Sequence, residues 1–141
     1  MSLSIFKDCH NWFYSDHSFE WTDDNENFKH FDKWIVLKPV EGIFKGDCED
    51  AALTIINRSL ALGVQKDQLY VCRVATQNCP KHHSFDHAVA LFISDDGKWW
   101  ISDNRYSSAV LNLFDIGGYT FYDAVSIDNL RGIGEPKLIG K

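Results

Sequence analysis

The sequence predicts an α+β fold in which helices pack against a small antiparallel sheet. A capped helical run occupies residues 48–62, and three strand-forming runs follow Gly63. The second and third of these runs are joined by a Ser-Asp-Asp-Gly turn at residues 94–97, which is typical of an antiparallel hairpin. The chain has 141 residues and is 45% hydrophobic, so we expect residues 1–141 to form a single domain with one core.

The segment before residue 46 is rich in aromatic side chains. The spacing of Phe28, Phe31 and Ile35 predicts a short helix that packs on the core. Pro39 and Gly42 indicate an irregular connection from there into the next helix.

Residues 48–62 have the pattern of an amphipathic helix. Asp47 is a good N-cap with Asp50 three residues later, which approximates a capping box, and Gly63 supplies the stop. Positions 48, 52, 55, 59 and 62 fall on one face and are small or apolar, which suits close packing against a sheet. Cys48 therefore belongs to the buried side of the helix, at its positive end.

The second half of the chain favours β structure. The apolar run at residues 86–93 is nearly continuous, as in a central strand, whereas Gly117–Gly118 is explained by flexibility before a strand. We expect strands at residues 68–75, 86–93 and 98–103, and an edge strand at 117–122.

Cys48 stands among carboxylates at the first turn of the predicted helix. The helix dipole and unpaired backbone N–H groups favour a thiolate there and can also receive an oxyanion. Asp47, Glu49 and Asp50 act in the opposite direction, because negative charge raises the pKa of a thiol. An imidazolium partner, side chains that point away, or a bound divalent cation would offset them. Both an activated nucleophile and an ordinary buried cysteine fit this segment.

The register of the hairpin decides whether His87 and Asp103 share a face. A loop centred near Asp95 sets them directly opposite one another, whereas a two-residue turn at 96–97 would place them on opposite faces. In the first register His87 lies on a face, with residues 89, 91 and 93, that a helix could cover. His87 could then take the proton of Cys48 while Asp103 orients the imidazole, giving a Cys-His-Asp triad.

Composition argues against several classes of partner. The formal net charge is −6, whereas a nucleic-acid or anionic-membrane partner usually needs a basic face. No apolar run reaches membrane-spanning length, and residues 1–20 lack the features of a secretory signal, so we expect a cytoplasmic protein. The four cysteines are then expected to be free thiols. The oligomeric state is left open.

A second group of candidate ligands lies in and after the first predicted strand. Cys72, Cys79, His82 and His83 are potential zinc ligands, but they lack the paired spacing of a structural zinc site. We interpret His82 and His83 as an exposed loop that borders a substrate cleft.

The order of these motifs resembles that of the bacterial transglutaminase-like cysteine peptidases, within the papain-like and transglutaminase-like superfamily. The similarity covers residues 32–104, and its cysteine motif is more specific than the other two. The residues that carry it are Asp32-Lys33-Trp34, Pro39, Glu41, Gly46-Asp47-Cys48-Glu49-Asp50-Ala51, His87-Ala88-Val89 and Asp103-Asn104.

This resemblance implies a papain-like or transglutaminase-like core with Cys48 as nucleophile, His87 as base and Asp103 as the orienting acid. In the members that are periplasmic proteases releasing biofilm adhesins, calcium binds through acidic residues that match Asp47 and Glu49. Calcium is therefore a candidate ligand here, although no cofactor is required for the chemistry.

Trp34 precedes the cysteine motif and is a candidate for oxyanion or substrate binding if its indole points inward. Ala51 departs from the family pattern, in which an aromatic residue often follows the acidic run. The adhesin-cleaving relatives are exported, so their substrate is not carried over. A phage or mobile-element origin, with action in the host cytoplasm, fits the compact chain as well as a cellular origin does.

The sequence therefore favours thiol-dependent hydrolysis of an amide in a protein or peptide, through an acyl-enzyme on Cys48. Transamidation or deamidation would use the same three residues and differ only in the group that resolves the thioester. A non-catalytic protein-binding module on the same fold is the alternative from a different class.

Overall fold

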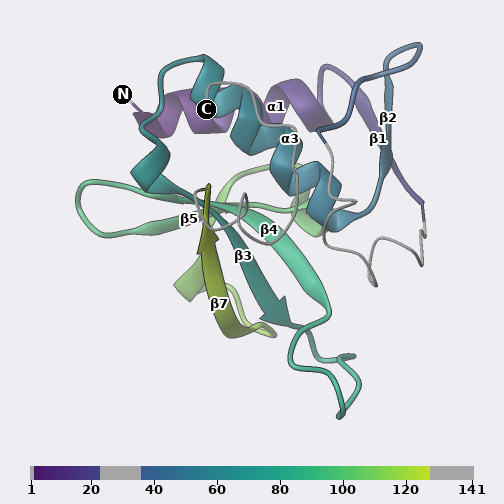
Figure 1. Cartoon of the computed structure of the whole chain (residues 1–141), viewed down its shortest axis with the longest axis vertical. Coiled ribbons are helices and arrows are strands. Elements are labelled where there is room, and N and C mark those ends of the chain that lie inside the picture. Colours follow the sequence, from purple (N-terminus) through teal and green to yellow (C-terminus); the bar gives the residue numbers. More distant parts are fainter. Residues whose placement is uncertain (1, 23–35, 128–141) are drawn as a thin grey trace.

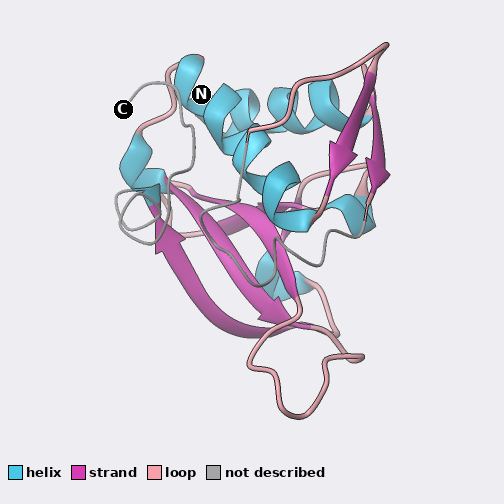
Figure 2. Cartoon of the chain, turned by 45° about the vertical axis from the view of Figure 1, so that its right-hand side comes forward, coloured by secondary structure: helices cyan, strands magenta, loops and turns pink. Residues whose placement is uncertain are grey.

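The computed structural model describes residues 2–22 and 36–127, which form two layers. Helices α1 (Ser2–Tyr14) and α3 (Cys48–Ala61) lie side by side over one face of a five-stranded sheet (Figure 1). A parallel ribbon of β1 (Ser18–Trp21) and β2 (Ile43–Gly46) flanks the helices, as Figure 2 shows. This architecture confirms the predicted α+β class.

The main sheet is antiparallel throughout, with strand order β6-β5-β4-β3-β7. The three strands predicted after Gly63 are present within about a residue of their predicted ends, and β7 is the predicted edge strand, displaced toward the C-terminus. The bounds are β3 Leu69–Ala75, β4 His87–Ile93, β5 Trp99–Ser102, β6 Leu111–Asn112 and β7 Thr120–Ser126, with 3-10 turns at Lys66–Gln68, Asn104–Tyr106 and Leu113–Asp115.

Helix α3 is the central element of the described structure. It begins at Cys48 with Asp47 as its N-cap, and both bonds of the predicted capping box are present: Asp50 N–H donates to Asp47 Oδ1 at 3.1 Å, and Asp47 N–H donates to Asp50 Oδ2 at 3.4 Å. Residues 48–57 are all buried, because α1 and the sheet cover different sides of the helix. The predicted apolar face ends one turn early, since Leu62 is 49% exposed at the C-cap.

Three elements of the N-terminal part, α1, β1 and β2, were not predicted. Helix α1 buries Phe6, Cys9, His10 and Phe13, which lie on one helical face. Polar residues between and among them obscure the apolar pattern in the sequence. Strand β2 occupies the end of a segment predicted to be irregular, which was wrong for residues 43–46. Its parallel partner β1 lies more than twenty residues earlier, so no local pattern reveals the pairing. The predicted helix around Phe28 and Phe31 lies outside the described residues.

The two faces of the sheet carry different packing. Ala88, Ala90 and Phe92 of β4 join the core beneath the helices, and the alternating residues Val89 and Leu91 join a second cluster on the opposite face. The expectation that a helix covers the face of residues 87, 89, 91 and 93 is therefore wrong. Successive side chains point to opposite faces, and the helices lie on the even-numbered side.

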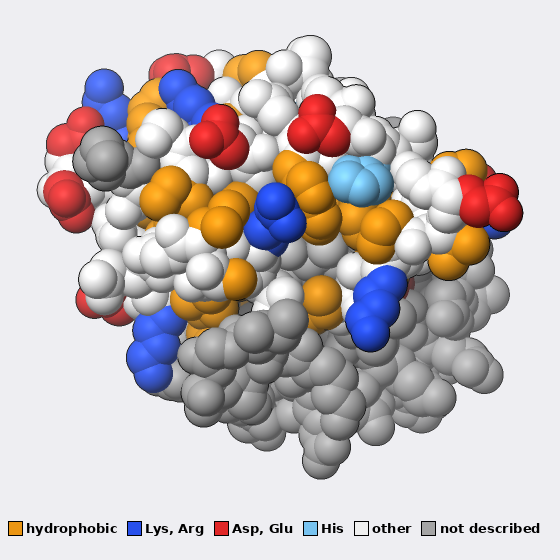
Figure 3. Space-filling view, turned by 90° about the horizontal axis from the view of Figure 1, so that it is seen from above, with side chains coloured by type: hydrophobic (Ala, Val, Ile, Leu, Met, Phe, Trp, Pro, Cys, Tyr) orange, Lys and Arg blue, Asp and Glu red, His pale blue; other side chains and the backbone are white. Residues whose placement is uncertain are grey.

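No helix within residues 2–22 and 36–127 has the length and apolar character needed to cross a membrane. Figure 3 views the molecule from above, and on the described part of that face Lys and Arg side chains are interspersed with Asp and Glu.

Truncation of helix α3 offers a matched test of this packing. Leu53 is fully buried, so we expect Leu53→Ala to lower the free energy of unfolding by about 2–5 kcal/mol through lost burial and a cavity. The same change at the half-exposed Leu62 should cost less than about 1 kcal/mol. Urea unfolding followed by circular dichroism measures both, and equal losses would contradict the position of the helix.

Candidate active site

Three side chains singled out from the sequence lie at the ends of adjoining elements. Cys48 is the first residue of α3, His87 is the first residue of β4, and Asp103 directly follows the last residue of β5. All three are buried, with exposures of 5%, 7% and 1%. Helix α3 packs on β4, and β4 pairs with β5, so the three element ends come to the same region of the molecule.

The Cys48 sulfur lies between a carboxylate and a backbone amide. Its S–H donates to Glu49 Oε1 at 2.8 Å, and the N–H of Ala88, next in the chain to His87, hydrogen-bonds the sulfur. This places the thiol beside the first peptide of β4. The described hydrogen bond of the thiol goes to Glu49 and not to the imidazole of His87, so the nucleophile–base pairing stays a prediction.

The surroundings favour the protonated thiol in this arrangement. Burial raises the pKa of Cys48 well above its ordinary value, and the charge and hydrogen bond of Glu49 and the charge of Asp47 raise it further, against the lowering effect of the Ala88 N–H. Burial and the Asp47 charge also raise the pKa of Glu49. The sequence left three ways to offset the negative charge beside Cys48, and one of them was that the acidic side chains point away from the sulfur. This is excluded for Glu49, whose carboxylate faces the sulfur.

His87 and Asp103 form a buried hydrogen-bonded pair, with His87 Nε2 2.7 Å from Asp103 Oδ1. Burial alone would raise the pKa of Asp103, but the hydrogen bond and charge of His87, together with hydrogen bonds from Tyr119 and the Arg105 N–H, bring the pKa below its ordinary value. The carboxylate is therefore ionised and only accepts hydrogen bonds. Nε2 must carry a proton to donate to it, which leaves Nδ1 as the basic nitrogen of a neutral His87 ring.

The register differs in detail from the prediction. Ala90 pairs with Ser102 and Leu91 with Ile101, so the hairpin loop is centred one residue later than expected. Continuing this ladder sets Asp103 beside Val89, two residues from His87 on the same face. The predicted direct opposition is wrong, but the shared face is correct, and a diagonal neighbour is still within reach of an imidazole.

The other candidate binding residues are the two predicted to bind calcium and Trp34. Asp47 caps α3 and Glu49 binds the thiol, and no group of three His, Cys, Asp or Glu side chains within residues 2–22 and 36–127 is arranged to hold a metal ion. Trp34 lies outside the described residues.

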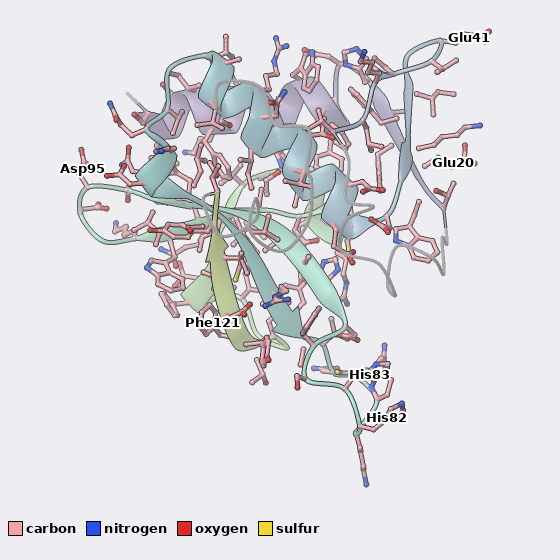
Figure 4. All side chains as sticks on the ribbon, viewed as in Figure 1. Glu20, Glu41, His82, His83, Asp95 and Phe121 are labelled. Carbon is pink, nitrogen blue, oxygen red and sulfur yellow. The ribbon has the colours of Figure 1, made fainter. Side chains whose placement is uncertain are left out.

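The cysteine and histidine group considered for zinc is not assembled in the described structure. Cys72 is fully buried in the sheet, and burial, with the charge of Asp123, raises its pKa to about 12, which favours a thiol over a metal-binding thiolate. His82 and His83 project from the loop between β3 and β4, away from the sheet (Figure 4). Cys79 bonds the backbone carbonyls of that loop.

Two tyrosines near the site were not singled out from the sequence. Tyr119 Oη donates to Asp103 Oδ2, and the ring centroids of Tyr119 and His87 are 5.8 Å apart. Burial raises the pKa of Tyr14 well above its ordinary value, and the charges of Asp103 and Cys48 add to the effect, so this hydroxyl lies near both groups. Each tyrosine comes from an element distant in sequence, and no motif spacing links either one to the cysteine.

The packing of helix α3 on an antiparallel sheet is that of the papain-like and transglutaminase-like fold. Within this fold class the chain is similar to LapG of Legionella pneumophila, a transglutaminase-like cysteine protease. The calcium-bound form of LapG matches with a TM-score of 0.66 and 21% identity, over 90% of this chain and 66% of that chain. A further LapG structure gives 0.66 and 22% over the same shares, and the EGTA-treated form gives 0.65 and 20%, over 90% and 64%.

The chain thus spans about two thirds of the length of the LapG structures. At this level of identity the likeness confirms the fold expected from the transglutaminase-like resemblance. Neither a scan against protein-family models nor a search of curated proteins gave a match.

The contact between Glu49 and the thiol predicts how Cys48 should respond to loss of one charge. In calcium-free buffer we expect Glu49→Gln to lower the pKa of Cys48 and to raise its alkylation rate at pH 7 by about ten-fold, because a like charge and its hydrogen bond are removed. Site-resolved mass spectrometry of iodoacetamide labelling across pH measures this.

Glu20→Gln is the matched control, since Glu20 is exposed on β1 at the outer edge of the molecule (Figure 4). An unchanged or slower Cys48 in Glu49→Gln would show that Glu49 does not set the protonation of the thiol.

Proposed function

We propose that the protein is a thiol-dependent amide hydrolase that acts on a peptide or protein through an acyl-enzyme on Cys48. The observation that carries this proposal is the buried hydrogen bond from His87 Nε2 to Asp103. The residue after His87, Ala88, donates its backbone N–H to the Cys48 sulfur. A histidine held in one tautomer by a buried carboxylate, beside a thiol at a helix N-terminus, has the parts that nucleophilic catalysis needs.

Each residue has a separate task in the proposed reaction. His87 Nδ1 removes the proton of Cys48, and the thiolate attacks the amide carbonyl to give a tetrahedral oxyanion. His87 returns this proton to the leaving amine as the carbon–nitrogen bond breaks, which leaves a thioester on Cys48. Water, deprotonated by His87, then attacks the thioester, and the carbon–sulfur bond breaks to release the acid. The Cys48 thiolate regains its proton from His87, and Asp103 stabilises the imidazolium at each stage.

The backbone N–H of Cys48 is a candidate donor to the oxyanion, because it lies at the N-terminal end of α3, where N–H groups point out of the helix. The proposed oxyanion or substrate contact of Trp34 is a further candidate, on a residue outside the described part of the chain.

An open hollow of about 570 Å³ beside the loop before β4 is a candidate place for part of the substrate. It is lined by Pro80, residues 82–86 and Tyr122, and Asp86 directly precedes His87 in the chain. A peptide lying there would pass His82 and His83, which fits their interpretation as the border of a cleft.

Calcium belongs to this proposal as a candidate ligand of Asp47 and Glu49. The two carboxylates are buried, and the charge of Asp47 raises the pKa of Glu49, so two hard oxygen donors lie close together there. They supply only part of a calcium shell, and water or backbone carbonyls would complete it. A bound cation would offset the negative charge beside the thiol.

Acyl-enzyme formation tests the proposed function directly. We expect a p-nitrophenyl ester of a blocked amino acid to acylate Cys48 and no other cysteine, as seen by intact mass and peptide mapping. His87→Ala should slow acylation by about 10²–10⁴-fold through loss of the base. Glu20→Gln, on the exposed strand β1, is the control and should match the parent protein.

The fate of the acyl group separates the alternatives. Turnover by water supports the hydrolase, preferential transfer to added methylamine supports a transamidase, and release of ammonia from a glutamine peptide supports a deamidase. A protein that forms no acyl-enzyme, or one in which His87→Ala equals the parent, would contradict catalysis and favour the binding module.

Calcium binding has its own measurement. We expect calcium at about 100 times its dissociation constant to stabilise the fold by about 2.7 kcal/mol, a rise in melting temperature of several degrees. Glu49→Gln should abolish this rise, whereas Glu20→Gln should keep it, and magnesium should be a poor substitute. Equal melting temperatures in calcium and in EGTA would refute the site.

A further inference from the structure

Tyr119 links the start of the last strand to the carboxylate that holds the histidine. It directly precedes β7, and its hydroxyl donates to Asp103 Oδ2. Its ring is tilted against the His87 ring at 5.8 Å between centroids, and the Arg105 guanidinium lies over the Tyr119 ring, 5.4 Å from its centroid. Tyr119 therefore contacts both members of the His87–Asp103 pair.

The distribution of donors on Asp103 gives the hydroxyl a distinct role. Oδ1 accepts from His87 Nε2 at 2.7 Å and from the Arg105 N–H at 3.0 Å, whereas Tyr119 is the donor that the described residues provide to Oδ2. With Oδ1 alone engaged, the carboxylate could rotate about its Cβ–Cγ bond. A donor on Oδ2 from another element fixes its plane, and hence the direction from which it accepts the His87 proton.

We propose that Tyr119 is a positioning residue that orients the Asp103 carboxylate and, through it, the His87 imidazole. This inference rests on the proposed function and adds a fourth residue to its machinery. Tyr119 acts through Asp103 and is not assigned a contact with substrate.

The hydroxyl is suited to remain a donor at all working pH values. Burial raises the pKa of Tyr119, and the hydrogen bond to Asp103 and the negative charge of that carboxylate raise it further. An ionised carboxylate accepts at both oxygens, so the direction of the bond is fixed from Tyr119 to Asp103.

Gly118 gives this tyrosine its backbone position. Its φ of +91° lies in the left-handed region, and a Cβ there would meet the Gln77 side chain at 3.4 Å. The Gly117–Gly118 pair, attributed from the sequence to flexibility, thus includes a residue whose conformation delivers the tyrosine to Asp103.

Tyr119→Phe tests the role because it removes the hydroxyl and keeps the ring. We expect the rate at which the p-nitrophenyl ester acylates Cys48 at pH 7 to fall by about ten-fold, the effect expected when a buried acceptor loses a hydrogen bond. We also expect the ring Nε2–H proton signal of His87 in the NMR spectrum to broaden, since a carboxylate held on one side protects that proton less from exchange.

Tyr106→Phe is the matched control. Tyr106 packs edge-on against Tyr119 with ring centroids 6.3 Å apart, and its hydroxyl makes no described bond to Asp103. It should retain the parent rate and the parent signal. Melting temperatures of both variants show whether a loss of rate follows a loss of folded protein.

The outcomes separate this inference from the proposed function. A slow Tyr119→Phe with a broadened His87 signal and a parent-like melting temperature supports the positioning role. If His87→Ala is slow but Tyr119→Phe matches Tyr106→Phe in rate and signal, the role of Tyr119 is overturned and the catalytic pair stands. If His87→Ala leaves acylation unchanged, the proposed function fails, and the assignment of Tyr119 to it fails as well.

Discussion

The first turn of α3 buries three carboxylates, and much of the surrounding structure follows from how each is satisfied. Charged groups taken out of water need hydrogen bonds or partners. Asp47 and Asp50 each accept the backbone N–H of the other, which starts the helix at Cys48 and so fixes the place of the sulfur. Glu49 instead accepts a hydrogen bond from the Cys48 thiol. The cap that starts the helix therefore also fixes the position of the Cys48 sulfur. It places negatively charged carboxylates beside that sulfur as well.

A second buried polar cluster ties α1 to the segment that carries Asp103. His10 Nε2–H donates to the Ser107 carbonyl at 3.0 Å, so Nδ1 accepts the Ser102 hydroxyl at 2.6 Å. Burial lowers the pKa of His10, which favours the neutral ring that this arrangement requires. Ser102 directly precedes Asp103, so the hydrogen bonds of His10 connect α1 to the chain on either side of Asp103. Tyr119, just before β7, hydrogen-bonds the Asp103 side chain. Three elements distant in sequence thus converge on one residue.

The sequence predicted the parts of the fold whose information is local. The ends of α3 are marked by Asp47, Asp50 and Gly63, because caps act within a few residues. The nearly continuous apolar run at residues 86–93 marks β4, because the side chains on both faces of this strand are buried in a core. Prediction failed where partners are distant: the β1–β2 pair, the face of the sheet that the helices cover, and the tyrosines near Asp103. The one-residue shift of the hairpin loop shows the same limit, since Asp95 and Asp96 are equally good turn residues. Cys48, His87 and Asp103 could be named because motif order points to them, but no pattern specifies which acceptor the thiol selects.

The charges around the sulfur constrain how a thiolate can form. In the proposed reaction, transfer of the Cys48 proton to His87 would place a thiolate and an imidazolium in a region that already holds Glu49 and Asp103. The positive charge of His87 also acts on Glu49, whose pKa it lowers, so one imidazolium faces three anions. Burial penalises that excess of negative charge. A cation held by Glu49 and Asp47 removes it, and so does a proton on Glu49, whose pKa is raised by its burial. Both routes act at the same carboxylate. In the proposed reaction, activation of the thiol would therefore depend on the charge state of Glu49 as much as on the hydrogen bond between His87 and Asp103.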